Sequence, residues 1–101
     1  MVRFHRSARA AADTTFPEVV QWAKEVADYV TSNYPEATIL AFAEQYGAVG
    51  TIHWYADYED IATLDQVGSQ LLTDEGYWAV LAKGTDLFIE GSANDTVMAS
   101  V

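Results

Sequence analysis

The chain contains 101 residues, half of them hydrophobic and 13% aromatic, and its fifteen acidic and five basic residues give a net charge of −10. A chain of this length forms one domain, so we expect a single domain over residues 1–101. With only two prolines and six glycines, the composition excludes disordered and collagen-like chains. The absence of cysteine excludes disulfides and thiolate catalysis.

The charge and the apolar runs also bear on partners and location. A net charge of −10 repels nucleic acid and anionic lipid, so we expect neither as a partner. No apolar run approaches the roughly 20 residues of a membrane span, and residues 1–6 lack the apolar core of a signal peptide. We therefore expect a soluble, cytoplasmic protein. The acidity suits a high-salt cytoplasm and an ordinary acidic protein alike.

Residues 2–9 alternate between apolar and polar side chains, which predicts a half-buried strand. Arg6 interrupts the apolar face, and all three arginines of the chain lie in this segment. The next element is a helix. Residues 15–18 have the spacing of a capping box, the apolar residues from Val19 to Val30 recur at three- and four-residue steps, and Pro35 ends the helix near Asn33.

Residues 37–46 and 49–58 are rich in apolar, β-branched and aromatic residues, which predicts two strands joined as a hairpin at Gly47–Ala48. A second helix is expected from residues 58–60 through Leu71, and residues 73–75 resemble a new helix cap. A further helix over residues 76–83 ends at Gly84. Residues 87–91 fit a helix or an extended segment, and residues 95–101 form a terminal strand.

This order of elements is that of the ferredoxin-like βαββαβ fold, an α+β class with a four-stranded antiparallel sheet and its helices on one face. We expect the strand order 4-1-3-2, with the first and third strands as central neighbours. The more apolar face of each strand is assigned to the helices, namely Phe4, Ala8, Ile52, Trp54, Val97, Ala99 and Val101.

The opposite face combines charged and aromatic side chains, which is atypical of a solvated surface and of an ordinary core. It contains Arg3, His5, Ser7, Arg9, Thr51, His53, Tyr55, Asp57 and Met98. The second strand is ambiguous, because either Leu40, Phe42 and Tyr46 or the alternate set Ile39, Ala41 and Ala43 can face this side, and we assign Leu40, Phe42 and Tyr46 to it. We expect the same face of a second copy to cover it, which predicts a homodimer.

The run from His53 to Asp60, followed by residues 71–78 and 87–92, is similar to the dimeric α+β barrel superfamily, which includes antibiotic biosynthesis monooxygenase-like proteins. That resemblance implies two ferredoxin-like protomers packed sheet against sheet around a lumen. The superfamily contains cofactor-independent monooxygenases, haem-degrading enzymes, small isomerases and proteins without known activity, so the resemblance selects no reaction. The haem-degrading members of the superfamily rely on an asparagine from an early strand and on a tryptophan and a histidine from later elements. Here no asparagine precedes Asn33 and no histidine follows His53, so the resemblance does not extend to haem breakdown of that type.

The best candidate for chemistry is the pair His5 and His53, which the predicted sheet places on one face of adjacent strands. An imidazole can remove a phenolic or α-keto proton, and Arg3 or Tyr55 can anchor the resulting oxyanion. The resemblance implies that the second helical region lines the pocket mouth, so Trp78 is a candidate stacking wall for a planar ligand. Alternatively, both histidines are hydrogen-bonded members of the dimer interface and the arginines pair with surplus carboxylates.

Two functions follow from these residues. The first is a small cofactor-independent, monooxygenase-like enzyme acting on an aromatic or polyketide-like molecule in the lumen. The second is a non-catalytic homodimeric structural or ligand-binding module. We expect no metal and no resident cofactor, because His5, His53 and Asp57 lack the helical spacing of a ligand set and no phosphate-binding or zinc motif is present.

Overall fold

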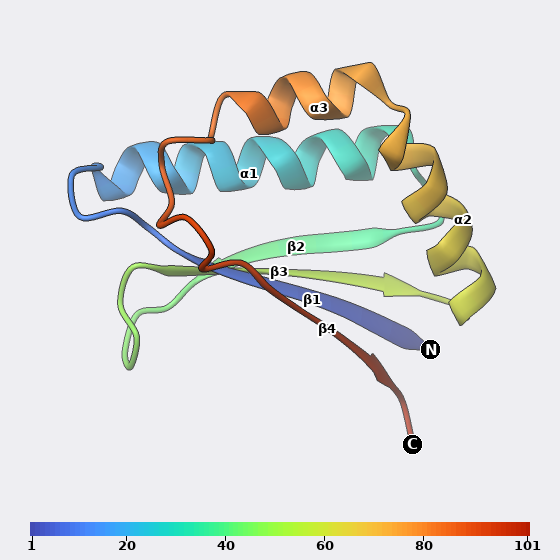
Figure 1. Ribbon diagram of the computed structural model, residues 1–101. Coiled ribbons are helices and arrows are strands. Elements are labelled where there is room, and N and C mark those ends of the chain that lie inside the picture. The colour runs from blue at the N-terminus through green and yellow to red at the C-terminus, as the bar shows by residue number, and fades with distance from the viewer.

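The sheet contains four antiparallel strands, β1 (Val2–Arg9), β2 (Thr38–Ala43), β3 (Thr51–Tyr58) and β4 (Asn94–Ala99), in a computed structural model that describes residues 1–101. The strands lie in the order β2-β3-β1-β4, so the predicted topology is confirmed. Helices α1 (Phe16–Asn33) and α3 (Glu75–Ala82) run over one face, and α2 (Ile61–Leu72) lies at one end of the sheet (Figure 1). The other face carries no helix (Figure 1).

The register decides which side chains share a face. In the central pair, Arg3 lies opposite Asp57 and His5 lies opposite Tyr55, so the odd-numbered residues of both strands point away from the helices. On β2, Leu40 pairs with Tyr55, which resolves the ambiguous parity of that strand. We refer to this helix-free side as the open face. It carries Arg3, His5, Ser7, Arg9, Leu40, Phe42, Thr51, His53, Tyr55, Asp57 and Met98, as predicted. Tyr46, which was also assigned to this face, instead lies in the connection after β2 and is exposed, because the strand ends at Ala43.

The core lies between α1 and the sheet and is divided into two clusters of buried side chains. Val19 of α1, Ile52 of β3 and Val67 of α2 are almost wholly inaccessible. By contrast, α3 contributes no buried residue, although its sequence is largely apolar. A helix of that composition normally packs onto a core. Here α3 instead borders a space beside the sheet that the side chains do not fill.

Several element boundaries differ from the prediction. The strand β2 ends at Ala43, and residues 44–50 form a turn-rich connection in place of a tight hairpin. Gly47 and Gly50 adopt φ values of 91° and 94° there, which favour glycine. Thr15 precedes α1 as expected, but its side chain makes no capping hydrogen bond. The last strand ends at Ala99, so Val101 lies beyond the sheet and is exposed, contrary to its assignment to the helix-packed face.

The two shorter helices begin at aspartates. Asp60 accepts a hydrogen bond from Thr63 N at the start of α2, and Asp74 accepts one from Tyr77 N at the start of α3. The Asp74 carboxylate also accepts the hydroxyls of Tyr29 at 2.7 Å and Tyr34 at 2.5 Å, which ties α3 to α1. These bonds lower the pKa of Asp74 and raise the pKa of Tyr34 to about 12.

The segment after α3 is neither a helix nor a regular strand. Phe88 forms an isolated antiparallel bridge with Ala10, and Leu87 is buried in the core cluster beneath α1. This bridge returns the chain to the edge of β1, where β4 begins. None of the helices has the length and apolar composition needed to cross a membrane.

Candidate functional site

The open face holds a line of three hydrogen-bonded side chains at the centre of the sheet. His5 Nε2 of β1 lies 2.8 Å from Nδ1 of His53 on β3. The other ring nitrogen of His53, Nε2, lies 2.6 Å from Oε1 of Glu44, the first residue after β2. The two histidines therefore meet, as the strand order predicts, and Glu44 extends the line toward the β2–β3 connection.

The electrostatics of this line follow from its surroundings. Burial and the neighbouring ring of His53 lower the pKa of His5. Hydrogen bonds from His53 and from the Ala48 N–H hold the pKa of Glu44 below its usual range. Glu44 is consequently ionised at neutral pH, so both of its oxygens act only as acceptors.

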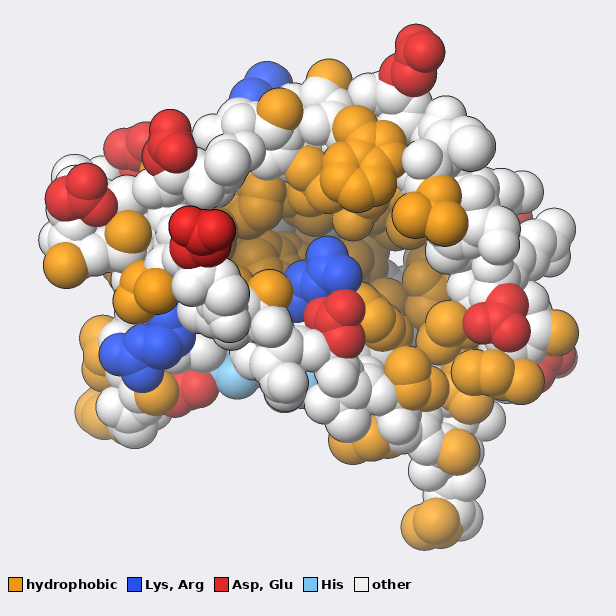
Figure 2. All heavy atoms as spheres, in the orientation of Figure 1, with side chains coloured by type: hydrophobic (Ala, Val, Ile, Leu, Met, Phe, Trp, Pro, Cys, Tyr) orange, Lys and Arg blue, Asp and Glu red, His pale blue; other side chains and the backbone are white.

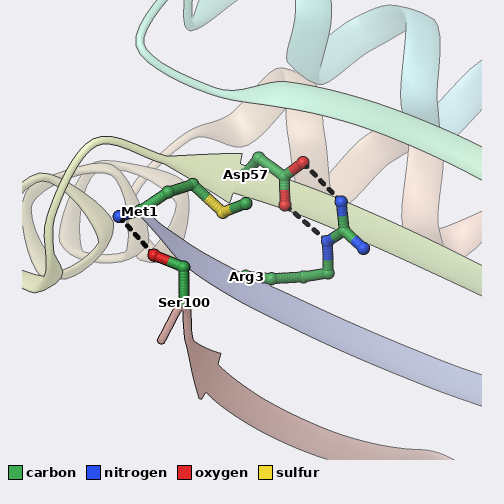
Figure 3. A network of polar contacts seen from close by, with 4 residues as sticks. All are labelled: Met1, Arg3, Asp57 and Ser100. Atoms are coloured by element: carbon green, nitrogen blue, oxygen red, sulfur yellow. Dashed lines mark hydrogen bonds and ion pairs between the residues drawn. The ribbon is translucent and has the colours of Figure 1, made fainter.

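Arg3 and Tyr55, the two predicted anchors, lie beside His5. The ring of Tyr55 stacks on the ring of His5 with centroids 4.5 Å apart, and the Arg3 Cζ lies 5.4 Å from the Tyr55 centroid. Arg3 is not free, because its Nε and Nη2 donate to the two oxygens of Asp57 at 2.7 and 2.9 Å (Figure 3). The pKa of Asp57 is lowered by this pair. The same view shows the Met1 amino group donating to the Ser100 hydroxyl at the end of β4 (Figure 3).

Exposed apolar side chains surround the polar groups of the open face. Leu40 is 58% exposed, Phe42 is 51% exposed and Met98 is 44% exposed. A shallow hollow of about 170 Å³ lies beside Leu40 and Phe42. It is lined by Arg3, Thr38, Leu40, Phe42, Tyr55 and Asp57.

Trp78 does not join this group. It lies on α3, on the helix side of the sheet, and its indole N–H donates to the Leu72 carbonyl at 3.1 Å. The sequence prediction that Trp78 shares a site with the histidines is therefore wrong in location, because α3 and the odd-numbered residues of β1 lie on opposite sides of the sheet. Trp78 instead borders a cleft of about 340 Å³ between the sheet and helices α2 and α3. The cleft is lined by Phe4, Arg6, Tyr58, Leu64, Gly68, Leu71, Leu72, Tyr77, Trp78 and Leu81.

The cleft is apolar except at one point. Arg6, which interrupts the apolar face of β1, donates through Nε and Nη2 to the two oxygens of Asp95 on β4 at 2.7 and 2.8 Å. Its guanidinium lies 5.5 Å from the ring of Phe4. Burial raises the pKa of the Tyr77 hydroxyl, and Arg6 opposes that rise. Figure 2 shows a hollow of hydrophobic side chains with a basic and an acidic side chain side by side at its mouth.

A second, narrower space continues from the cleft toward α1. It has a volume of about 80 Å³ and shares Phe4, Arg6 and Tyr77 with the larger cleft. It reaches Trp22 and Trp54, so an entering molecule would meet aromatic rings along its length. No group of three or more histidine, aspartate or glutamate side chains is arranged to hold a metal ion.

Solved structures share this architecture over nearly the whole chain. A NIPSNAP domain protein from Burkholderia xenovorans aligns with a TM-score of 0.80 and 14% identity, covering 100% of this chain and 95% of the other. A NIPSNAP family protein from Agrobacterium tumefaciens aligns with a TM-score of 0.78 and 17% identity, covering 97% of this chain and 86% of the other. An antibiotic biosynthesis monooxygenase aligns with a TM-score of 0.73 and 15% identity, covering 100% of this chain and 99% of the other.

The chain has the ferredoxin-like fold of these proteins. The fold-level resemblance to antibiotic biosynthesis monooxygenase-like proteins is thereby confirmed. At identities below 20%, the similarity establishes the fold and no activity. No protein-family profile and no curated protein matches the sequence.

Three residues of these sites escaped the sequence prediction. Glu44 was placed inside a strand, so its contact with His53 depended on where β2 ends. Arg6 was expected, like the other arginines, to pair with a carboxylate, but not to line a cleft, and its partner Asp95 comes from a strand 89 residues away. The interruption itself was the available signal, because an arginine on the core side of a central strand needs a carboxylate nearby.

Proposed function

We propose that this protein is a small, monooxygenase-like enzyme that acts without a resident cofactor on an aromatic or polyketide-like molecule bound in the cleft between the sheet and helices α2 and α3. The single observation that carries the proposal is the cleft of about 340 Å³. Its volume falls at the lower end of the range typical of small-molecule sites, about 300–1,000 Å³. A protein of this size gains stability by filling such a space, so an open apolar cleft is better explained by a ligand.

The lining favours a flat, mainly apolar ligand with one acidic oxygen. Phe4, Tyr77 and Trp78 offer rings on which a planar molecule can stack. Arg6 uses Nε and one N–H of Nη2 for Asp95, so its remaining N–H groups, which lie beside the Tyr77 hydroxyl, can donate to an oxygen of the ligand. A phenolate or enolate oxygen suits this position, since the guanidinium stabilises its negative charge.

Gly68 provides a test that separates binding from folding. It lies in α2 among the cleft-lining residues, and a Cβ placed on it meets no atom within 4 Å. Gly68→Leu therefore puts a side chain into open space while improving helix propensity. We expect it to weaken 2-naphthol binding, followed by tryptophan fluorescence, at least about tenfold. Gly68→Ala is the matched control and should bind almost as wild type does. Equal binding by all three proteins would reject the cleft as the site.

Turnover decides between the enzyme and a non-catalytic ligand-binding module. Phenols that bind the wild-type protein are incubated with it in air, and oxygenated products are measured by mass spectrometry. If the protein is an enzyme, we expect oxygenated product with the wild type and none above background with Gly68→Leu. Binding without product across a panel of phenols and enols would favour the ligand-binding module.

We also propose that a second copy covers the open face, so that the protein acts as a homodimer. The supporting observation is the exposure of Leu40, Phe42 and Met98 on a face that no helix covers. Leu40→Glu should shift the mass measured by light scattering from two chains to one at micromolar concentration, because it buries a charge in the interface. Ile61→Glu, at an equally exposed position on α2, should not. A wild-type protein of one-chain mass would refute the dimer.

The histidine pair is a second candidate for acid–base chemistry, favoured by the 2.8 Å contact between the rings. Because His5 and His53 point away from the cleft, they would serve a molecule in the space enclosed by two open faces. Arg3 and Tyr55 would anchor that molecule, as their position beside His5 allows. His5→Gln should abolish turnover of a lumen-bound phenol and leave cleft binding of 2-naphthol unchanged. Unchanged turnover would remove the pair from the chemistry.

A further inference from the structure

The positions of protons along Glu44, His53 and His5 follow from the two contacts. A carboxylate oxygen can only accept, so His53 Nε2 must carry a proton and donate it to Glu44 at 2.6 Å. In a neutral His53 ring, Nδ1 is then the acceptor, and His5 Nε2 must donate to it at 2.8 Å. Both ring nitrogens of His53 are thereby occupied. The only basic nitrogen left in the line is Nδ1 of His5, which makes no hydrogen bond within the chain.

We propose that Glu44, His53 and His5 form a one-directional proton relay, in which Nδ1 of His5 accepts a proton from a weakly acidic O–H group and the Glu44 carboxylate stabilises the positive charge that passes to His53. The proposal deepens the second candidate site described above and rests on it for the substrate class, a phenol or an enol. It assigns the basic role to His5 alone, and it makes His53 and Glu44 positioning residues.

The relay conserves protons at each step. A proton arriving from the substrate forms a new bond at Nδ1 of His5, and the substrate oxygen keeps the electron pair. The proton on Nε2 of His5 then moves to Nδ1 of His53, so the positive charge passes from His5 to His53. The imidazolium of His53 lies 2.6 Å from the Glu44 carboxylate, where the opposite charge stabilises it.

The β2–β3 connection holds Glu44 in this position. The second oxygen of Glu44, Oε2, accepts the Ala48 N–H at 2.7 Å, so the carboxylate is fixed between the loop and the histidine. Gly47 packs against that oxygen, and a Cβ placed on it would lie 3.2 Å from Oε2. The side chains of Glu44 and His53 are 28% and 19% exposed, so bulk water has limited access to their contact. The loop that replaces the predicted hairpin thus supports the charged end of the relay.

Other charged and titratable groups around His5 do not break the direction of the relay. Tyr55 covers one side of the His5 ring by stacking and forms no hydrogen bond to it. Arg3, two residues along β1, is neutralised by Asp57. Asp95 of β4 acts on His5 through its charge but is bonded to Arg6 on the other side of the sheet. Glu44 is therefore the one carboxylate connected to His5 by hydrogen bonds.

The relay can be tested by nuclear magnetic resonance before any substrate is known, because the chain contains only two histidines. Long-range proton–nitrogen spectra at pH 8 should show both rings protonated at Nε2 and not at Nδ1. In Glu44→Gln, the first protonation of the pair should occur at a pH lower by about half a unit to one unit, since the carboxylate that stabilises the positive charge on His53 has been removed. Glu36→Gln, which removes the same charge from an exposed loop, should leave it unchanged.

Transmission through His53 is tested by combining variants. In a His53→Gln background, Glu44→Gln should change the pKa of His5 by less than half as much as in the wild-type background. Equal shifts in the two backgrounds, equal shifts in Glu44→Gln and Glu36→Gln, or protonation of His53 at Nδ1 alone would overturn the relay. If Glu44→Gln disturbs the β2–β3 loop, Glu44→Asp keeps the charge but shortens the side chain, and it should also lower the first pKa.

Activity gives an arm that is independent of the spectra. If phenols are turned over, the acidic limb of the pH–rate profile should move in Glu44→Gln by the same amount as the His5 titration. A relay seen in the spectra without turnover would refute the proposed enzyme function and leave the relay intact. Turnover with the same pH–rate profile in the wild type and in Glu44→Gln would refute the relay and leave the proposed enzyme function intact.

Discussion

Gly84→Ala should destabilise the protein by about 3 kcal/mol, whereas Gly68→Ala should leave it unchanged or more stable by up to about 1 kcal/mol. Gly84 follows α3, and a Cβ placed on it would overlap the indole ring of Trp22. Trp22 cannot easily move aside, because its N–H donates to the Val80 carbonyl at 2.9 Å and its ring packs edge-on against Trp54 at 5.8 Å. Overpacking costs about 1–3 kcal/mol and the loss of the indole hydrogen bond about 1 kcal/mol.

Urea unfolding of the two variants measures this difference directly. Both substitutions add the same methyl group, so the unfolded chain gains the same restriction from each. We expect the midpoint to fall for Gly84→Ala with an unchanged slope, and the melting temperature to fall by about 12 °C or more. A Gly84→Ala protein as stable as the wild type would refute the close packing of α3 on Trp22. A destabilised Gly68→Ala protein would refute the open space beside α2.

Three further substitutions test the core, the α1–α3 junction and the cleft. Ile52→Ala should cost about 2–5 kcal/mol in urea unfolding because Ile52 is 1% exposed, while Ile89→Ala, at a half-exposed position, should cost less than about 1 kcal/mol. Hydrogen bonding to Asp74 raises the pKa of Tyr34 from 10.0 to about 12. The contribution of this bond to the free energy of unfolding is therefore complete below pH 10 and is lost as the pH rises to 12. Tyr34→Phe should therefore flatten the alkaline stability curve, and an identical curve would contradict that bond. Arg6→Gln should weaken the binding of 2-naphthol more at pH 10.5, where the naphthol is ionised, than at pH 7. Equal losses at the two pH values would show that Arg6 does not anchor the anionic oxygen of the ligand.

The topology could be predicted because each strand carries its own signal. Residues 2–9 alternate along a half-buried strand, and β-branched and aromatic residues mark residues 51–58, so the order of elements was sufficient to select the ferredoxin-like arrangement. The end of β2 could not be predicted in the same way. Ala43, Glu44 and Gln45 differ little in strand propensity, and the glycines that mark the turn, Gly47 and Gly50, come only four and seven residues after the last residue of the strand.

The site on the open face could be predicted from the sequence, whereas the cleft could not. Once the first and third strands are neighbours, period-two alternation places His5 and His53 on one face, and the contact follows from register. The cleft depends on the distance between α3 and the sheet. Two contacts with α1 position α3, namely the hydrogen bonds from Tyr29 and Tyr34 to Asp74 and the close packing of Trp22 against Gly84. Such tertiary distances leave no periodic trace, so Trp78 was assigned to the wrong side of the sheet.

The same alternation predicts that the two candidate sites act independently. Along β1, Phe4 and Arg6 face the cleft and His5, between them, faces the open side, so the sheet separates the two sets of side chains. Gly68→Leu should therefore leave the titration of His5 unchanged, and Glu44→Gln should leave the affinity for 2-naphthol unchanged. In the double variant the two losses should add, since neither residue shares a partner with the other. Coupling larger than about 0.5 kcal/mol between them would mean that β1 shifts as a unit when either face is altered, and the two sites would then have to be treated as one.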